Sequence, residues 1–426
     1  MKIDRQLAPE LHPINEPELL KAQCHRLDNG IPVYFIKAGK QDVCKIDFVF
    51  DAGVVYQDKP LLSSLSNAML QEGTSRRDAA EIAEIFDFHG AYLQLAADYH
   101  NGTASLVCLD KHLGTLLPVM EDLIKNSAFP ETEFNTLVQR RKQRFILENE
   151  KAKILCQKKF SEVLFGIGHP YTLRLKTEDF DEVELTNFRD FYKKHYHSSA
   201  CEVFISGQFQ DDVFELLNHY FGAPDWTGEK LSANIKPPIS SGQKFTQVLK
   251  ADSIQSAIRM GKLLVQKNHP DYYGLQVLTT ILGGYFSSRL MTNIREEKGY
   301  TYGIGANFVS LNEAGYLLIA TEVDKTYEAD TLHEINKELE LLTTEPVSDD
   351  ELERVKQYLT GEFLREFDGP FALSQAFRNI HDFHLDYSFY DKFFNAIQPI
   401  SADDLMQLAK KYFMTESFYT VVAGKA

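Results

Sequence analysis

Residues 187–209 read NFRDFYKKHYHSSACEVFISGQF, and residues 404–425 near the C-terminus read DLMQLAKKYFMTESFYTVVAGK. Both stretches combine a helical pattern ending in Lys-Lys and aromatic residues, a short turn, and an apolar strand that closes on glycine. The closing glycines, Gly207 and Gly424, lie 217 residues apart, close to half of the 426-residue chain. The chain therefore repeats itself once, which predicts a duplicated domain of roughly 210 residues.

A second pair of segments supports the repeat and helps to divide the chain. FPETEFNTLVQRRKQ, from Phe129, and PVSDDELERVKQYL, from Pro346, each place a proline and acidic residues before a long helical pattern. Between the halves, GAPDWTGEKLSANIKPPISSGQK has the Gly, Pro and Ser content of a linker. We predict an N-terminal half over residues 1–221, a linker over 222–245 and a C-terminal half over 246–426.

Within each half, strand patterns and helix patterns alternate. Ile46, Phe48 and Phe50 recur at every second position, which is the period of a β-strand. Residues 113–125 and 349–367 have helical patterns, although Pro118 interrupts the first of them. The order of these elements predicts an α+β fold in which helices cover the sheets.

Composition narrows the classes of function. The net charge of −16 argues against nucleic acid as a partner, and 44% apolar residues are ample for packed cores. The five cysteines are odd in number and form no CxxC pair, so the sequence predicts neither a disulfide framework nor a thiolate zinc site. The N-terminal residues contain prolines and charges, and no run approaches the ~20 apolar residues of a membrane span. We therefore expect no membrane association and a cytoplasmic location.

Residues 282–304 read LGGYFSSRLMTNIREEKGYTYGI, and LDNGIPVYFIKAG, DFVFDAGVVY, MLQEGTS, SAFPETEF and FGIGHPY precede them in order. This series resembles the pitrilysin/insulinase family of zinc metallopeptidases, particularly the bacterial chains related to mitochondrial processing peptidase. The resemblance runs nearly end to end. It implies two homologous halves, each with a mainly antiparallel sheet covered by helices, that form a clamshell around an internal chamber.

Catalytic members of that family carry His-x-x-Glu-His in the helix that precedes Gly-Thr. Residues four apart share a helix face, so two imidazoles can hold one zinc ion while the carboxylate polarises its water. Counting back from Gly73-Thr74, these positions fall on Ser64, Asn67 and Ala68. None of the three is an imidazole ligand or a base, so we predict that this chain binds no metal there and has no cofactor of its own.

The resemblance places the third zinc ligand, a glutamate on a later helix, within residues 144–150. The best alignment gives Arg144 or Phe145, and Glu148 and Glu150 lie near enough to be considered. A lone carboxylate does not hold a catalytic zinc ion.

Family members also use an arginine and a tyrosine seven residues apart in the second half to bind and polarise the substrate backbone. Arg295 and Tyr302 have this spacing. A guanidinium offers several donors to a peptide carbonyl, and a phenol can donate to the oxyanion of a tetrahedral intermediate. If an arginine and a tyrosine with this spacing stood in an unrelated sequence, we would interpret them as a helix-end ion pair and a half-buried strand tyrosine. Here the surrounding segment resembles the family, and this favours a role in substrate binding. Tyr300 competes with Tyr302, although it lies where the family commonly has an apolar residue.

Other polar residues have weaker patterns. Two histidine pairs have metal-ligand spacing but lack a third ligand, and a further histidine resembles part of a structural turn of the family. Three carboxylates lie near the expected cleft, although most carboxylates in a protein simply lie on solvent-exposed surfaces. These residues are His195 and His197, His381 and His384, His169, Asp51, Glu72 and Asp98.

The sequence therefore predicts a non-catalytic, substrate-binding subunit of a heterodimeric zinc metallopeptidase. The resemblance implies that a homologous partner chain supplies the zinc ion, its ligands and the catalytic glutamate, whereas this chain donates Arg295 and Tyr302 to hydrolysis of a peptide substrate. The first alternative is an inactive scaffold or assembly protein that forms a homodimer. The second is an active homodimer with a displaced metal site at the histidine pairs.

Overall fold

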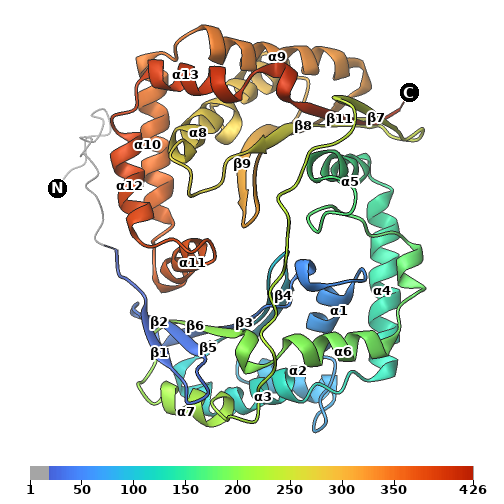
Figure 1. Ribbon diagram of the computed structural model, residues 1–426, viewed down its shortest axis with the longest axis vertical. Coiled ribbons are helices and arrows are strands. Elements are labelled where there is room, and N and C mark those ends of the chain that lie inside the picture. Colours follow the sequence, from blue (N-terminus) through green and yellow to red (C-terminus); the bar gives the residue numbers. More distant parts are fainter. Residues whose placement is uncertain (1–18, 426) are drawn as a thin grey trace, which may run out of the picture.

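The computed structural model describes residues 19–425 and shows two lobes, each built on one β-sheet, that face each other (Figure 1). The first sheet has the strand order β1-β2-β6-β3-β5-β4, and the second has the order β7-β11-β8-β10-β9. The strands are β1 (Gln23–Arg26), β2 (Pro32–Lys37), β3 (Val43–Phe50), β4 (Tyr92–Ala97), β5 (Gly102–Leu109), β6 (Cys201–Gly207), β7 (Phe245–Leu249), β8 (Gln255–Leu264), β9 (Ile304–Leu311), β10 (Ala314–Asp324) and β11 (Tyr419–Gly424).

Helices cover both sheets. The first lobe and its extensions contain α1 (Leu62–Met69), α2 (Ala79–Phe88), α3 (Leu113–Lys125), α4 (Glu131–Asn149), α5 (Ala152–Phe165), α6 (Leu185–His195) and α7 (Val213–Phe221). The second contains α8 (Tyr272–Thr279), α9 (Glu328–Thr344), α10 (Asp349–Arg365), α11 (Pro370–His381), α12 (Ser388–Ile397) and α13 (Ala402–Tyr412). Two segments are π-helical, η5 (Thr280–Gly284) and η6 (Met291–Glu297). Short 3₁₀ turns are η1 (Val54–Tyr56), η2 (Asp110–His112), η3 (Glu178–Phe180), η4 (Ser198–Ala200), η7 (Lys325–Tyr327) and η8 (Thr415–Ser417).

The two sheets share one topology. β6 pairs parallel with β2 and antiparallel with β3, just as β11 pairs parallel with β7 and antiparallel with β8. β5 and β4 then continue the first sheet in antiparallel fashion, as β10 and β9 continue the second. β1 is the additional strand of the first sheet. The predicted α+β fold with two repeated halves is confirmed.

The two glycines that close the sequence repeat occupy equivalent places in the sheets. At Gly207 a Cβ atom would lie 2.2 Å from the Val43 carbonyl oxygen of β3, and at Gly424 it would lie 2.4 Å from the Ser256 hydroxyl of β8. Gly207 also has a φ of 114°, which favours glycine. The repeat is therefore retained in the sequence because each closing strand must approach its neighbour closely.

Local sequence signals place the helices well. α3 spans Leu113–Lys125 as expected and accommodates Pro118 in its interior. α10 begins after Ser348, whose side chain accepts a hydrogen bond from the Glu351 amide, and ends at Arg365, two residues before the predicted end. A serine N-cap followed by acidic residues satisfies free amides and complements the helix dipole.

Each half contributes one helix to the inner face of the other half's sheet. α5, from the first half, packs on β8 and β11, where Phe160 lies so close to Gly261 that a Cβ there would meet the ring at 2.8 Å. α11, from the second half, packs on β2 and β6, and its Phe377 lies 5.1 Å from the Tyr34 ring, centroid to centroid. Burial of apolar surface on both sheets holds the two halves together.

Residues 222–244, within the predicted linker, contain no helix or strand, and β7 begins at Phe245. α5 belongs to the first half by sequence but lies on the second sheet in space. None of the helices in residues 19–425 combines the length and the apolar composition that crossing a membrane requires.

An ion pair fastens α11 to the first sheet. His381 Nε2 lies 2.9 Å from the Glu202 carboxylate of β6, and its ring packs against Tyr34 and Phe204. The hydrogen bond to Glu202 raises the pKa of His381 above its usual range. Because the folded-state pKa is raised, the pair stabilises the fold fully below the unfolded pKa of about 6.5, and this contribution is lost as pH rises through the folded pKa.

We predict that Glu202→Gln lowers the melting temperature by on the order of 1–2 °C at pH 6, because the half-exposed pair contributes at most about 1 kcal/mol. The difference from wild type should shrink as pH rises to about 9. Differential scanning calorimetry across this range provides the measurement. Glu162→Gln, at a pair with Lys159, is the matched control and should show no such trend. A Glu202→Gln effect that is constant or grows with pH would contradict the prediction.

Candidate functional site

The three zinc-motif positions lie on α1, a helix that is almost entirely buried. Asn67 is 2% exposed, and its amide donates to the Thr103 carbonyl oxygen (3.3 Å) and to the Tyr196 hydroxyl (3.1 Å). Ser64 donates to the Leu61 carbonyl oxygen, and Ala68 is 8% exposed. Asn67 thus ties α1 to β5 and to the residue that follows α6. The three side chains do not fit a zinc ion, since together they offer no imidazole and no carboxylate.

In the region expected to hold the third zinc ligand, two of the candidate side chains contact other parts of the protein. Glu150 pairs with Lys250 at 2.9 Å, and Phe145 packs against Phe180 with ring centroids 5.3 Å apart. Arg144 and Glu148 are exposed on α4. In the described part of the chain, no group of three or more His, Cys, Asp or Glu side chains is arranged to hold a metal ion.

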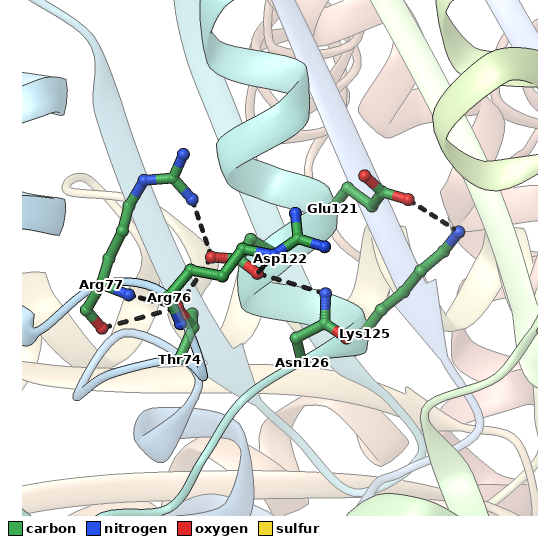
Figure 2. A network of polar contacts seen from close by, with 7 residues as sticks. All are labelled: Thr74, Arg76, Arg77, Glu121, Asp122, Lys125 and Asn126. Atoms are coloured by element: carbon green, nitrogen blue, oxygen red, sulfur yellow. Dashed lines mark hydrogen bonds and ion pairs between the residues drawn. The ribbon is translucent and has the colours of Figure 1, made fainter.

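Behind α1, a buried carboxylate holds the Gly-Thr turn (Figure 2). Asp122 on α3 is 1% exposed; it accepts hydrogen bonds from the Thr74 hydroxyl and from Arg77 Nη1, both at 2.7 Å, and from the Asn126 amide at 3.2 Å. Arg76 lies 3.7 Å away. The network fixes the chain that leaves α1 and, with it, the position of the helix.

In the second half the structure brings Arg295 and Tyr302 together. Arg295 lies on η6, and its Nε donates to the Tyr302 carbonyl oxygen at 3.1 Å. Its guanidinium lies 4.7 Å from the centroid of the Phe286 ring, within cation–π range. The Tyr302 side chain is 94% exposed, so its hydroxyl is available to a ligand. Tyr300, by contrast, stacks on Tyr327 with ring centroids 4.5 Å apart.

A compact hydrogen-bond network holds the turn that carries Tyr302. The Gly303 amide donates to the Thr301 hydroxyl (3.1 Å), and the Thr321 hydroxyl donates to the Gly303 carbonyl oxygen (2.9 Å). The Thr301 hydroxyl donates to the Glu322 carbonyl oxygen of β10 at 2.8 Å. The backbone on both sides of Tyr302 is therefore fixed to the sheet while its side chain projects outward.

The η6 segment is anchored from its other side by α9. Asn293 donates to Glu334 at 2.9 Å and to Glu338 at 2.7 Å. The hydrogen bond from Asn293 is the main cause that holds the pKa of Glu334 below its usual range, and Lys298 adds to it. Arg295 therefore sits on a π-helical segment with fixed ends, a type of irregularity that is frequent at functional sites.

The weaker histidine candidates have structural partners. His195 is 1% exposed, its Nδ1 lies 2.6 Å from the Asp51 carbonyl oxygen, and burial lowers its pKa to about 4, so it is neutral at pH 7. His197 Nε2 lies 3.1 Å from the Lys194 carbonyl oxygen. His169 accepts from the Tyr171 amide. His384 has a φ of 55° in the turn after α11.

The three carboxylates named from sequence do not converge. Burial raises the pKa of Asp51, and Glu72 lies 3.7 Å from Arg140. Asp98 accepts from two amides of its own turn at 2.8 Å. None of the three belongs to the residues that line the space beside Tyr302.

Comparison with known families adds an independent observation. A family model described as insulinase (peptidase family M16) matches residues 33–163, and one described as the peptidase M16 inactive domain matches residues 182–359. Together they span nearly three quarters of the chain. The chain belongs to peptidase family M16. The family expected from the sequence is thereby confirmed.

The M16 relatives of this chain are named both as proteases and as inactive or non-peptidase homologues. The uncharacterized zinc protease YmxG of Bacillus subtilis is 23% identical over 84% of this chain and 86% of its own length. The non-peptidase homolog YmxG of Helicobacter pylori is 21% identical over 89% of each chain. A mitochondrial-processing peptidase subunit alpha-1 of Dictyostelium discoideum is 24% identical over 49% of this chain and 32% of its own length.

A solved M16 structure shares the fold. The crystal structure of a peptidase M16 inactive domain from Pseudomonas fluorescens superimposes with a TM-score of 0.86 at 21% identity, covering 96% of this chain and 99% of that one. The mixed α+β lobes of this chain are therefore those of an M16 protein.

Sequence reasoning missed four residues around Arg295 and Tyr302. Thr301 and Thr321 hold the turn, Phe286 lies under the Arg295 guanidinium, and Arg259 faces the cavity beside Tyr302. Only Arg259 had a usable signal, since it is a charge within the otherwise apolar stretch SAIRMG. The others depend on contacts between segments distant in sequence.

We predict that Asp122→Asn destabilises the protein by about 2–3 kcal/mol, because a buried carboxylate that accepts three hydrogen bonds is replaced by a neutral amide facing Arg77. Urea denaturation followed by circular dichroism measures the change. Asp181→Asn, at a 60%-exposed carboxylate paired with Lys142, is the control and should cost less than about 1 kcal/mol. Equal effects of the two variants would show that the network does not stabilise the fold.

Proposed function

We propose that this chain is the non-catalytic, substrate-binding subunit of a heterodimeric zinc metallopeptidase. The observation that carries the proposal is the contrast between the two halves. The first-half motif positions offer no zinc ligand, whereas the second half presents Arg295 and an exposed Tyr302 on a firmly held turn. A homologous partner chain supplies the zinc ion and its activated water.

In this proposal the two side chains act on the substrate peptide. After Nε has bonded to the Tyr302 backbone, and with Nη1 lying 3.8 Å from the Glu296 carboxylate, Nη2 of Arg295 remains for a peptide carbonyl. The Tyr302 hydroxyl donates to the oxygen on which charge develops during attack, a contribution that is largest in the transition state. The fixed turn limits the reorganisation that this contact requires.

The relatives support this proposal in part and also favour one alternative. The subunit of mitochondrial-processing peptidase is by its name a part of an assembly. The non-peptidase homolog of Helicobacter pylori favours the alternative that the chain is an inactive scaffold, such as a homodimer. The two proposals differ in whether Arg295 and Tyr302 contribute to turnover.

We expect that the purified chain alone carries no stoichiometric zinc and does not cleave peptides, because Ser64, Asn67 and Ala68 supply neither ligands nor a base. Elemental analysis after dialysis against micromolar zinc provides the measurement. One tightly bound zinc ion per chain at neutral pH, lost when residues 64–68 are substituted, would contradict the expectation.

In the chain reconstituted with its zinc-bearing partner, Tyr302→Phe should lower kcat by about 10²- to 10³-fold, because one oxyanion donor is removed. Arg295→Ala should raise KM as well, since a guanidinium bonded to the peptide backbone acts in the ground state and the transition state. Steady-state kinetics measures both effects.

Tyr300→Phe is the matched control for Tyr302→Phe and should change kcat little, because the Tyr300 ring stacks on Tyr327. Melting temperature and subunit association should be unchanged in all three variants. Full activity with both Arg295 and Tyr302 replaced would favour the scaffold alternative.

A further inference from the structure

A cavity of about 260 Å³ lies directly beside Tyr302, on the face of the second sheet that α5 partly covers. Its wall includes Thr301, Tyr302, Arg259 of β8 and Glu322 of β10, together with Lys153 of α5 from the first half. With a water molecule occupying about 30 Å³ of liquid, this space accommodates one side chain or one chain end. The cavity therefore adjoins the exposed Tyr302 side chain and is large enough to hold part of a ligand.

Arg259 occupies the centre of the sheet on this face. β8 pairs it with Ala320 of β10 and Val421 of β11, and its neighbours two positions away on β8 are Ala257 and Gly261. The two nearest residues on the same face of β8 are small, and Arg259 lines the cavity. Within residues 19–425, the Arg259 guanidinium donates no side-chain hydrogen bond, and its surroundings act on it through burial and more distant charges.

The charge of Arg259 is not neutralised by its surroundings. Burial, the main cause, lowers the pKa of Arg259, but a guanidinium remains charged at any physiological pH. Two of its neighbours are neutral, since burial raises the pKa of Cys156 to about 12 and raises that of Tyr316. Glu322 is the nearest opposite charge, and it already pairs with Lys153 at 3.1 Å.

These charges leave the cavity with an excess positive charge, in a chain whose net charge is −16. A half-buried charge without a partner is unfavourable, so an anion that pairs with it gains affinity. The planar guanidinium matches the two oxygens of a carboxylate in a bidentate arrangement.

We propose that this cavity binds a carboxylate of the peptide ligand, with Arg259 as its bidentate partner. The carboxylate belongs either to an acidic side chain or to the C-terminus of the peptide. The inference deepens the proposed function by naming a substrate class, and rests on it in taking the ligand to be a peptide. Arg259 is then a specificity-determining residue placed next to the Arg295 and Tyr302 pair.

The test measures binding of four defined peptides to the full chain by isothermal titration calorimetry at low salt. Two are acetylated, amidated pentapeptides, Ala-Ala-Glu-Ala-Ala and Ala-Ala-Gln-Ala-Ala. The other two are acetylated pentaalanine with a free or an amidated C-terminus. We expect at least one acidic peptide to bind about tenfold or more tightly than its neutral counterpart, and the pair that shows the difference identifies the source of the carboxylate.

Arg259→Gln should abolish this preference, while Arg365→Gln, at an exposed arginine on α10, should retain it. If Arg259→Gln does not fold, Arg259→Lys keeps the charge without the bidentate geometry and should retain only part of the preference. Raising the salt concentration should weaken binding of the acidic peptide more than binding of its neutral counterpart.

The proposal is overturned if wild type binds acidic and neutral peptides equally, if no peptide binds, or if Arg259→Gln leaves the preference intact. These outcomes are separate from the test of the proposed function. If Arg295 and Tyr302 prove not to contribute to turnover in the reconstituted pair, carboxylate binding by the chain alone is unaffected. If the chain alone shows no preference for a carboxylate, the contribution of Arg295 and Tyr302 to turnover is unaffected.

Discussion

The exchange of helices between the two halves is the contact on which the rest of the architecture depends. Each sheet has an apolar inner face, and in each case a helix from the other half covers it: α5 lies on β8 and β11, and α11 lies on β2 and β6. Neither sheet is covered by its own half alone. The same contacts set the separation of the lobes and bring Lys153 of α5 into the wall of the cavity beside Tyr302.

Much of this architecture can be predicted from the sequence, because the duplication and the periodicity of helices and strands depend on residues close together in the chain. The repeated glycines marked equivalent strands, the helical pattern placed α3, and the proline and acidic residues before α10 placed that helix within two residues. The helix exchange could not be predicted, because the sequence pattern of α5 does not indicate which of the two sheets the helix covers. The π-helical form of η6 was also missed, because its hydrogen bonds are decided by packing against α9 through Asn293.

For the candidate site, the sequence identified residues but not their surroundings. The positions 64, 67 and 68 were located by counting from Gly-Thr, yet their burial and the bonds from Asn67 to Thr103 and Tyr196 required the structure. The Arg295 and Tyr302 spacing was visible, whereas the Thr301 and Thr321 network that supports it joins β10 to the turn before β9. Arg259 was missed altogether, and the sheet register shows which face of the second sheet it occupies.

The helix exchange also constrains how the chain reaches its native state. Cys156 of α5 donates to the Val421 carbonyl oxygen at 3.3 Å, across 265 residues of chain. β11 inserts between β7 and β8, so the second sheet is incomplete until residues 419–424 have been synthesised. During synthesis the apolar side of α5 has no final partner, and long-range closure of this kind slows folding. The nascent chain is therefore exposed to aggregation between the emergence of α5 and the arrival of β11.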